Sequence, residues 1–338
     1  PARPSSAPPP AAAPTRAYAA RGGRSLVAHA RHVTPPWAHV ASLVSRRRMR
    51  CARRLPSAAA CSAYAAGGGV TITTGATGGN ILFSDTLNGT QTLGLTAGTG
   101  NIDFDAIVGG GNPLGKVTVS SAGTITSDLA FSAAGLEWTS TGVTLLDGLV
   151  TSTEVVKLTA GGIDVDAGIT AAGFEVELNS SNGLTIDGGA ITTTGGNNTA
   201  AGVIDINTSN GNTVINSSLI AQGGTATGTN AGAAGGVVTI DTGAGDTVTF
   251  GSGADINTSG SAASGTNQAS AIGGAVTINT GDALITLTDT TITTSQGAAT
   301  GSGTATATGG TVTFSDEVAL AGGGVTITTG ATGGNILF

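Results

Sequence analysis

The sequence predicts an all-β fold, a right-handed parallel β-helix (a β-solenoid), over residues 66–338, behind a disordered N-terminal segment. Three observations support this. Short strand-like segments recur, among them VTIDT from Val238, VTINT from Val276 and VTFSD from Val312. Apolar and polar residues alternate inside them, which is the period of a half-buried β-strand. Glycine-rich turns separate them, and 55 of the 57 glycines lie in this region, a composition that disfavours helices.

The repeating unit is 34 to 38 residues long. From Ile204 it is 34 residues to Val238, then 38 to Val276 and 36 to Val312. Apolar residues mark three short strands in each unit, at Ile206, Ile215 and Ile220, at Ile240, Phe250 and Ile256, and at Ile278, Leu287 and Ile292. With these side chains turned inward and Thr, Asp, Asn and Ser outward, three strands make one coil of a parallel β-helix. Residues 66–338 are then expected to form about eight to thirteen coils of roughly 20–36 residues.

A polar excursion follows the third strand of each unit. It reads QGGTATGTNAGAAGG at residues 222–236, GSAASGTNQASAIGG at 260–274 and QGAATGSGTATATGG at 296–310. The starts are 38 and 36 residues apart, so each excursion leaves its coil at the same place. We therefore expect all three to project from one edge of the solenoid.

An eighteen-residue sequence, AGGGVTITTGATGGNILF, occurs twice without a change, at residues 66–83 and 321–338. Identity over this length indicates a recent duplication. We interpret the sequence as a window from a longer array, and expect SDTLNGTQTLGL or a close copy to follow Phe338. Residues 84–190 show the same short strands with shorter turns.

The N-terminal segment has a different composition. Residues 1–65 hold eleven Arg, nine of the ten Pro, all three His and no acid, whereas 66–338 holds twenty acids against Lys116 and Lys157, a net charge of −18. A segment rich in Pro, Ala and Arg cannot bury enough apolar surface to offset its chain entropy, so we predict disorder. Three interpretations stay open: a transit peptide, a signal region, and a sequence foreign to the repeat domain.

A nucleic-acid-binding arm is disfavoured, because Tyr18 and Trp37 alone do not make an aromatic platform for bases. For Cys51 and Cys61, a disulfide between them is one interpretation, and two incidental thiols are the favoured one. The repeat region has no Cys and no His, which excludes disulfides and Cys/His metal sites there. It has no run of eighteen apolar residues, so no transmembrane helix is expected.

The sequence FSDTLNGTQTLGLTAGTGNIDFDAIVGGGNPLGKVTVSSAGTIT, from Phe83 to Thr126, resembles the β-strand repeats of large bacterial exoproteins. These are the filamentous-haemagglutinin-like and autotransporter-like adhesins. The Gly-Gly–Val-Thr-Ile units after residue 200 look like the same class. The resemblance implies a non-catalytic structural or adhesive role, and a location in secreted form or at the cell surface. The secretion domain and the translocator barrel of that class have no counterpart in this sequence.

β-Helix folds also host polysaccharide lyases and hydrolases, which need clustered carboxylates. Three pairs of acids at i, i+2 place both side chains on one face of a strand: Asp103/Asp105, Asp164/Asp166 and Glu175/Glu177. A paired-acid site or a ladder of divalent cations is one interpretation, and a solvated outer face is the other. Because the region has only two Lys and no His, we predict no enzyme activity and no catalytic residue.

Two further binding functions are weighed. Weak calcium sites would lie in the turns GAGDTVTFG at residues 243–251 and TGDALITL at 280–287, which match the nonapeptide calcium repeat only in part. Ice binding would use the Thr-x-Thr pairs Thr71/Thr73, Thr124/Thr126 and Thr326/Thr328, but Asp241 and Asn279 interrupt such a ladder. No cofactor-binding and no metal-ligating residue is assigned.

Other motifs carry structural interpretations. Trp138 is expected to pack in the core or at a coil edge and not to stack on a ligand, because Phe131 is the one other aromatic in the adjacent segment that could complete a platform. The glycine-rich stretches do not open a helix or end in Gly-Lys-Ser/Thr, which excludes phosphate-binding loops. Asn88, Asn179 and Asn198 head glycosylation motifs that matter only in a eukaryotic secretory route.

The partners expected from the sequence are host or matrix glycans or surface proteins, bound through the repeated excursions. Lateral or end-to-end self-association is a further expectation, and nucleic acid is not expected as a partner.

Overall fold

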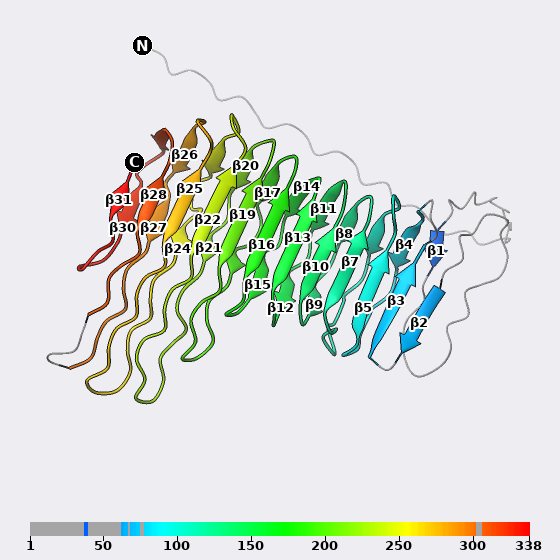
Figure 1. Ribbon diagram of the computed structural model, residues 1–338, viewed down its shortest axis with the longest axis horizontal. Helices are drawn as coiled ribbons and strands as arrows, with labels where there is room; N and C mark the ends of the chain where they lie inside the picture. Colours follow the sequence, from blue (N-terminus) through cyan, green and yellow to red (C-terminus); the bar gives the residue numbers. More distant parts are fainter. Residues whose placement is uncertain (1–36, 40–61, 67, 75–77, 302–305) are drawn as a thin grey trace, which may run out of the picture. The chain divides into compact units, whose positions relative to one another are not determined.

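The computed structural model describes residues 37–39, 62–66, 68–74, 78–301 and 306–338. All regular structure in these residues is β-strand, and the strands build three sheets, which we call A, B and C (Figure 1). Sheet A contains, in spatial order, β1 (Trp37–His39), β4 (Asn80–Phe83), β6 (Ile102–Phe104), β8 (Ile125–Ser127), β11 (Val143–Leu146), β14 (Gly162–Val165), β17 (Leu184–Ile186), β20 (Thr213–Ile215), β23 (Val248–Phe250), β26 (Ile285–Thr288) and β29 (Val318–Ala321).

Sheet B contains β2 (Ser62–Ala66), β3 (Gly69–Thr73), β5 (Thr92–Thr96), β7 (Val117–Ser121), β10 (Leu136–Thr139), β13 (Val156–Ala160), β16 (Val176–Ser180), β19 (Ile204–Thr208), β22 (Val238–Thr242), β25 (Val276–Asn279), β28 (Val312–Phe314) and β31 (Ile336–Leu337). Sheet C contains β9 (Phe131–Ala133), β12 (Val150–Ser152), β15 (Ile169–Ala171), β18 (Ile191–Thr192), β21 (Leu219–Ile220), β24 (Ile256–Asn257), β27 (Thr291–Thr293) and β30 (Thr326–Thr328).

The chain visits the sheets in the order B, A, C and then returns to B one coil further on. Each strand pairs in parallel with the equivalent strand of the next coil, except β2, which pairs antiparallel to β3. This is the parallel β-helix that the sequence predicts. Its right-handedness stays a prediction, which the general preference for right-handed crossovers supports.

Coil length changes along the solenoid while strand register is kept, apart from one irregularity between β5 and β7, where Leu95 pairs with Val119 and Thr96 with Ser121. Val117 pairs with Leu136, only 19 residues later. Ile204 pairs with Val238, which in turn pairs with Val276 and then Val312. The 34-, 38- and 36-residue units predicted from the sequence are therefore confirmed as whole coils.

The core is a set of inward columns of apolar side chains. Ile206, Ile240 and Ile278 stack in one of them, and none of the three is exposed to solvent. The inward assignment of Ile220 is wrong. Leu219 is buried instead, and it lies between Ile191 and Ile256 in the core column of sheet C. When two adjacent residues are both apolar, pairing with neighbouring coils decides which one faces inward.

The polar excursions, described at residues 222–236, 260–274, 296–301 and 306–310, all leave between sheets C and B and run side by side (Figure 1). They therefore project from one edge of the solenoid, as predicted. In two of them, a buried threonine just before the excursion forms hydrogen bonds with the glycine that ends it. The Thr258 hydroxyl donates to the Gly274 carbonyl at 2.7 Å, and the Gly274 N–H donates back to the Thr258 carbonyl at 2.7 Å. Thr294 and Gly310 repeat both bonds. A Cβ on Gly274 would lie 1.8 Å from the Gly236 carbonyl oxygen, so this position requires glycine.

The duplicated eighteen residues occupy different sheets in their two copies. In the first copy, residues 66–83 contribute β3 to sheet B and β4 to sheet A. In the second, residues 321–338 contribute β30 to sheet C and β31 to sheet B. The same residues face inward in both, since Ile72 pairs with core residue Leu95 and its counterpart Ile327 pairs with core residue Ile292. An alternating strand of this kind therefore fits more than one side of the coil.

The chain divides into two compact units, Pro1–Pro35 and Pro36–Phe338. The first unit and most of the predicted disordered segment 1–65, including Cys51 and Cys61, lie outside the described residues. Within that segment, β1 pairs with β4 and β2 pairs with β3 over five residues.

Candidate functional site

A column of five aspartates follows the strands of sheet A on five successive coils. We call it the aspartate ladder, and its members are Asp105, Asp128, Asp147, Asp166 and Asp187. Each comes directly after a buried residue of the strand, and these buried residues, Phe104, Ser127, Leu146, Val165 and Ile186, pair in register. Successive carboxylates are therefore one coil apart, about 4.8 Å along the solenoid. All five side chains are exposed.

Electrostatic repulsion acts along the ladder. Partial burial, followed by the charges of Asp166 and Asp128, raises the pKa of the Asp147 carboxyl above its usual range. Beside the ladder, burial and then the charge of Asp105 raise the pKa of Asp103. Burial and then the charges of Asp166 and Asp187 raise the pKa of Asp164. The carboxyls of Asp147, Asp103 and Asp164 are thus protonated more readily than an isolated surface acid.

The structure does not bring the predicted acid pairs into one site. Asp103 and Asp164 share an outward column of sheet A, but Thr126 and Leu145 stand between them. One oxygen of Asp164 is buried without a hydrogen-bond partner. Of the four acids in the two pairs, Asp105 and Asp166 belong to the aspartate ladder. The Asp103/Asp105 pair and the Asp164/Asp166 pair are therefore three coils apart, farther than the separation of the two carboxylates in a glycosidase.

The Glu175/Glu177 pair belongs to a different face. Glu177 points outward from sheet B, where the Lys157 ammonium donates to both of its oxygens at 2.7 Å. The amide of Asn179 donates to the same carboxylate at 2.8 Å. These hydrogen bonds outweigh the effect of burial and lower the pKa of Glu177. Glu177 therefore serves as an ion-pair partner of Lys157.

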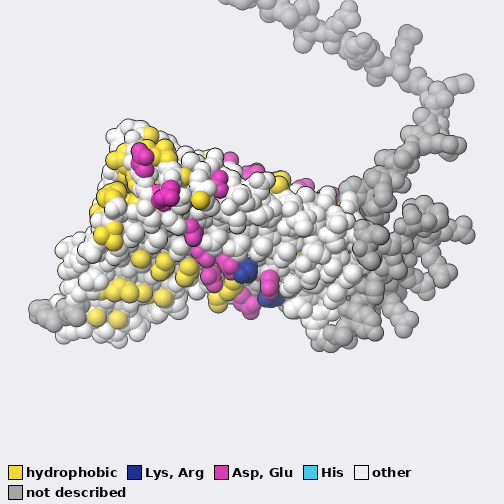
Figure 2. Space-filling view, turned by 45° about the horizontal axis from the view of Figure 1, so that its top comes forward, with side chains coloured by type: hydrophobic (Ala, Val, Ile, Leu, Met, Phe, Trp, Pro, Cys, Tyr) yellow, Lys and Arg dark blue, Asp and Glu magenta, His cyan; other side chains and the backbone are white. Residues whose placement is uncertain are grey.

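The second lysine has an equivalent role. Lys116 pairs with Glu137 at 2.7 Å, and the hydrogen bond from Lys116 lowers the pKa of Glu137. Figure 2 shows lysine side chains beside acidic ones on the solenoid surface. Both lysines of the repeat region thus link neighbouring coils of sheet B, and in the described part of the chain neither stands beside the aspartate ladder.

Other carboxylates accept bonds from the backbone of a neighbouring coil. Asp316 accepts from the N–H groups of Thr280 and Asp282 at 2.6 and 2.9 Å, and these bonds lower its pKa. Asp255 accepts from the Thr291 N–H at 2.7 Å. The Asp289 carboxylate likewise accepts from Gly323 and Gly324. These acids stabilise turns. Within the ladder, the Asp187 carboxylate accepts a bond from the side-chain amide of Asn216 on the next coil.

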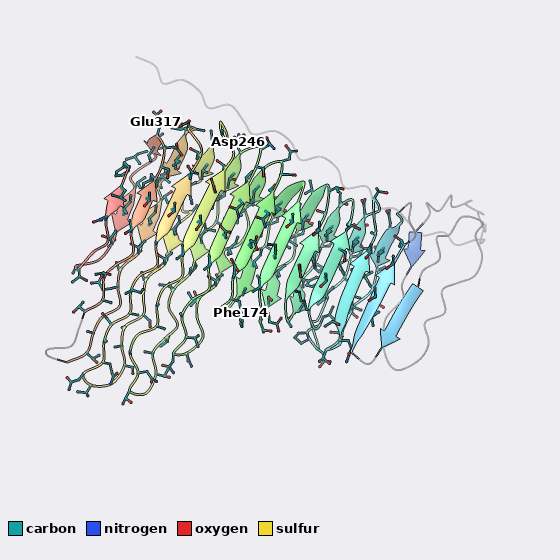
Figure 3. The ribbon with its side chains drawn as sticks, viewed as in Figure 1. Phe174, Asp246 and Glu317 are labelled. Carbon is teal, nitrogen blue, oxygen red and sulfur yellow. The ribbon has the colours of Figure 1, made fainter. Side chains whose placement is uncertain are left out.

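The two calcium-type turns, residues 243–251 and 280–287, lie at the corner between sheets B and A. Asp246 and Glu317 lie at this edge in Figure 3, and Phe174 lies at the opposite one. Asp282 adopts a left-handed backbone conformation, with φ of 76°. Within the described ranges, no group of three His, Cys, Asp or Glu side chains has the geometry to hold a metal ion.

The threonine pairs form no extended two-column ladder. Thr71 and Thr73 pair with Gly94 and Thr96 of the next coil. In sheet A, Thr126 lies between Asp103 and Leu145. In sheet C, Thr326 and Thr328 pair with Thr291 and Thr293, so a two-coil patch exists there. The next residue in that column, Asn257, interrupts it.

Trp138 lies in the core, as predicted. Its indole packs edge-to-face on Phe131 with ring centroids 5.1 Å apart, and stacks on Phe104 at 5.9 Å. Its N–H is buried without a hydrogen-bond partner. Among the glycosylation motifs, the Asn179 amide is occupied by Glu177 and by Asn207, which donates to it at 3.1 Å.

Family models, curated proteins and solved structures contain no match to this chain. Among the residues that the structure describes, no helix has the length and hydrophobicity to cross a membrane.

Replacing Asp147 with asparagine should stabilise the solenoid at pH 7. Each like-charged neighbour about 4.8 Å away costs at most about 0.9 kcal/mol in water, and salt screens this further. We therefore expect a gain of less than about 1 kcal/mol, measured by urea unfolding. Glu154→Gln, which removes an exposed charge outside the ladder, is the control and should change little.

The pH dependence has a defined sign. A raised pKa means that the folded state binds more protons than the unfolded state above about pH 4, so stability should rise as the pH falls from 7 toward about 4.5. The lowered pKa values of Glu137, Glu177 and Asp316 act in the opposite sense, and their contribution is lost below about pH 4. Asp147→Asn should flatten the rise between pH 7 and 4.5. An unchanged slope would contradict repulsion along the ladder.

Proposed function

We propose that residues 66–338 form a structural and adhesive repeat region of a large secreted or cell-surface protein. The observation that supports this most directly is the lateral stacking of the three excursions. Gly223 donates to the Ser259 carbonyl and Gly260 to the Ser295 carbonyl, both at 2.9 Å, which links the outgoing limbs. Gly232 donates to Ala269 and Gly273 to Thr308, both at 3.1 Å, which links the returning limbs.

The result is a ledge along one edge of the solenoid, which we call the excursion ledge (residues 222–236, 260–274, 296–301 and 306–310). It contains no charged residue and is rich in Gly, Ala, Ser and Thr. Regular hydrogen bonding preorganises its backbone, which lowers the entropy lost on binding. A surface that presents small polar residues of similar character on successive coils suits a repetitive ligand such as a glycan or a matrix protein, because several weak contacts then add as avidity.

Stepwise shortening of the ledge tests this proposal. The chain itself offers a short connection, since residues 172–175 link β15 to β16 without an excursion. Each excursion would be replaced by this four-residue link, one, two and three at a time. Binding to immobilised glycans and extracellular-matrix proteins should weaken with each removal, while circular dichroism confirms that the coils stay folded. Binding that is unaffected by all three replacements would contradict adhesion through the ledge.

The alternative, a β-helical carbohydrate-active enzyme, rests on the raised pKa values around the aspartate ladder. The same chain would be incubated with pectins, alginates and other polysaccharides, and reducing ends and unsaturated products measured. We expect no product. Product that disappears in Asp147→Asn or Asp164→Asn variants would replace the structural proposal with the enzymatic one.

A further inference from the structure

Two successive coils carry the same tripeptide, Ser-Asn-Gly, at the corner between sheets B and A. Residues 181–183 connect β16 to β17, and residues 209–211 connect β19 to β20. Their asparagines, Asn182 and Asn210, are exposed, and their glycines have left-handed backbones with φ of 87° and 83°. A third Asn-Gly step, Asn88-Gly89, lies between β4 and β5. Such steps are open to deamidation, because glycine has no side chain to shield its backbone nitrogen from the asparagine carboxamide.

The backbone nitrogen of the glycine decides whether this reaction starts. The Gly183 N–H donates to the Asn210 carbonyl oxygen at 2.7 Å, and the Gly89 N–H donates to the Asn112 carbonyl oxygen at 3.1 Å. Both nitrogens are therefore held in place and keep their protons. The N–H of Gly211, by contrast, donates to no acceptor among the described residues, so its proton is open to a base from solution.

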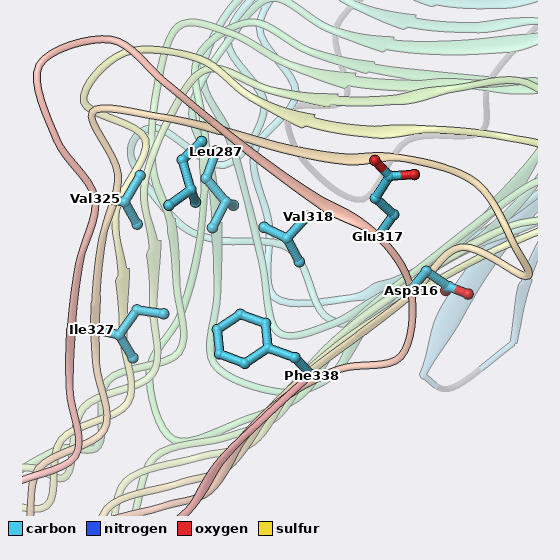
Figure 4. A pocket seen from close by; sticks show the side chains of 8 residues that line it. Leu287, Asp316, Glu317, Val318, Val325, Ile327 and Phe338 are labelled. Carbon is cyan, nitrogen blue, oxygen red and sulfur yellow. The ribbon is translucent and has the colours of Figure 1, made fainter.

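The same corner two coils further on shows how its N–H groups are satisfied elsewhere. There the Asp316 carboxylate, labelled in Figure 4, accepts from the N–H groups of Thr280 and Asp282 at 2.6 and 2.9 Å. In the described part of the chain, no carboxylate takes this role for Gly211.

The bond that blocks Gly183 activates the step after Asn210. The Asn210 carbonyl and the Gly211 N–H belong to one peptide unit, in which charge is delocalised. A donor on the carbonyl oxygen therefore stabilises the anion that forms when Gly211 loses its proton. The Asn210 carboxamide makes one long bond, from its nitrogen to the Ser181 carbonyl at 3.3 Å, so the side chain can turn toward Gly211.

We propose that Asn210 is a site of spontaneous deamidation in the folded protein, while Asn182 and Asn88 are protected. A base from solution takes the Gly211 proton, and the nitrogen attacks Cγ of Asn210. The carboxamide nitrogen takes up a proton and leaves as ammonia. The succinimide that results adds one water molecule at either carbonyl and opens to aspartate or isoaspartate. Both products add a negative charge, and isoaspartate also inserts a methylene into the main chain between β19 and β20.

The test compares the steps within one protein. The full chain is incubated at mildly alkaline pH, both folded in buffer and unfolded in urea, and peptide mass spectrometry follows each asparagine. In urea, Asn182 and Asn210 should react at similar rates, because their tripeptides are identical. In the folded chain, Asn210 should react at least about five-fold faster than Asn182, since Gly183 must first break a hydrogen bond of ordinary strength. Equal rates in the folded chain, or a faster reaction at Asn182, would overturn the proposal.

Asn210→Gln is the matched variant, because it keeps a carboxamide but forms a cyclic imide far more slowly. Isoaspartate, detected by enzymatic methylation, should accumulate in the unchanged chain and stay near its starting level in Asn210→Gln. Circular dichroism confirms that the variant is folded. Equal accumulation in the two chains would place the modification at another residue and would also overturn the proposal. Neither measurement depends on adhesion through the excursion ledge.

Discussion

Replacing Ile240 with aspartate should lower the free energy of unfolding by at least about 4 kcal/mol. Ile240 has no exposed surface and lies between Ile206 and Ile278 in the inward column of sheet B. A carboxylate at this position has neither a partner nor access to water, and the columns above and below it lose their contacts as well. Urea denaturation followed by circular dichroism measures the loss.

The neighbouring residue is the control. Asp241 is exposed, and it accepts one hydrogen bond, at 2.8 Å, from the side-chain amide of Asn279. Asp241→Asn keeps an oxygen that can accept this bond, so the change should stay within about 0.5 kcal/mol. Equal losses at residues 240 and 241 would mean that the inward and outward faces of β22 are exchanged.

Replacing Trp138 with alanine should cost about 3–5 kcal/mol. Trp138 is 1% exposed and holds together the internal aromatic cluster, because it contacts both Phe131 and Phe104. Truncation leaves a cavity between coils whose backbones are fixed by parallel pairing on both sides, so the site cannot collapse to fill it. Thermal and urea unfolding of the two proteins give the difference.

Trp138→Phe separates ring packing from the polar group. It retains an aromatic side chain against Phe131, and it removes a buried N–H that has no hydrogen-bond partner. Because an unsatisfied buried donor itself costs about 1–3 kcal/mol, its removal offsets part of the lost contact. We expect a loss of less than about half that of the alanine variant. A phenylalanine variant as unstable as the alanine variant would show that the indole N–H has a partner in solution.

Register in the later coils could be predicted from the sequence because the signal repeats. Ile204, Val238, Val276 and Val312 each start a Val-Thr-Ile-like strand, and parallel stacking requires equivalent residues to pair. Ile220 could not be placed in the same way. Leu219 beside it is equally apolar, and the choice between them depends on Ile191 and Ile256, residues of other coils.

The aspartate ladder could not be found by examining pairs within one strand. Asp128, Asp147 and Asp187 have no acid two residues away, so none of them belongs to an i, i+2 pair. The signal that does find them is spacing by coil length, since successive members of the ladder are 23, 19, 19 and 21 residues apart. In a solenoid, equivalent side chains of successive coils line up along the stacking direction. Candidate sites should therefore be sought among residues separated by one repeat length.

The different placement of the two eighteen-residue copies has a genetic consequence. Nine further strands of sheet B follow β3 before the second copy begins to contribute β30, so the copies are separated by nine turns and two-thirds of a turn. Where the DNA that encodes the two identical peptide segments is also alike, unequal crossing-over can join one copy to the other, and each such event would add or delete a non-integral number of turns. Every strand that follows the crossover point would then lie in the neighbouring one of the three sheets. Array length and the direction in which each surface faces would therefore vary together among alleles, with the inward alternation of the strands preserved.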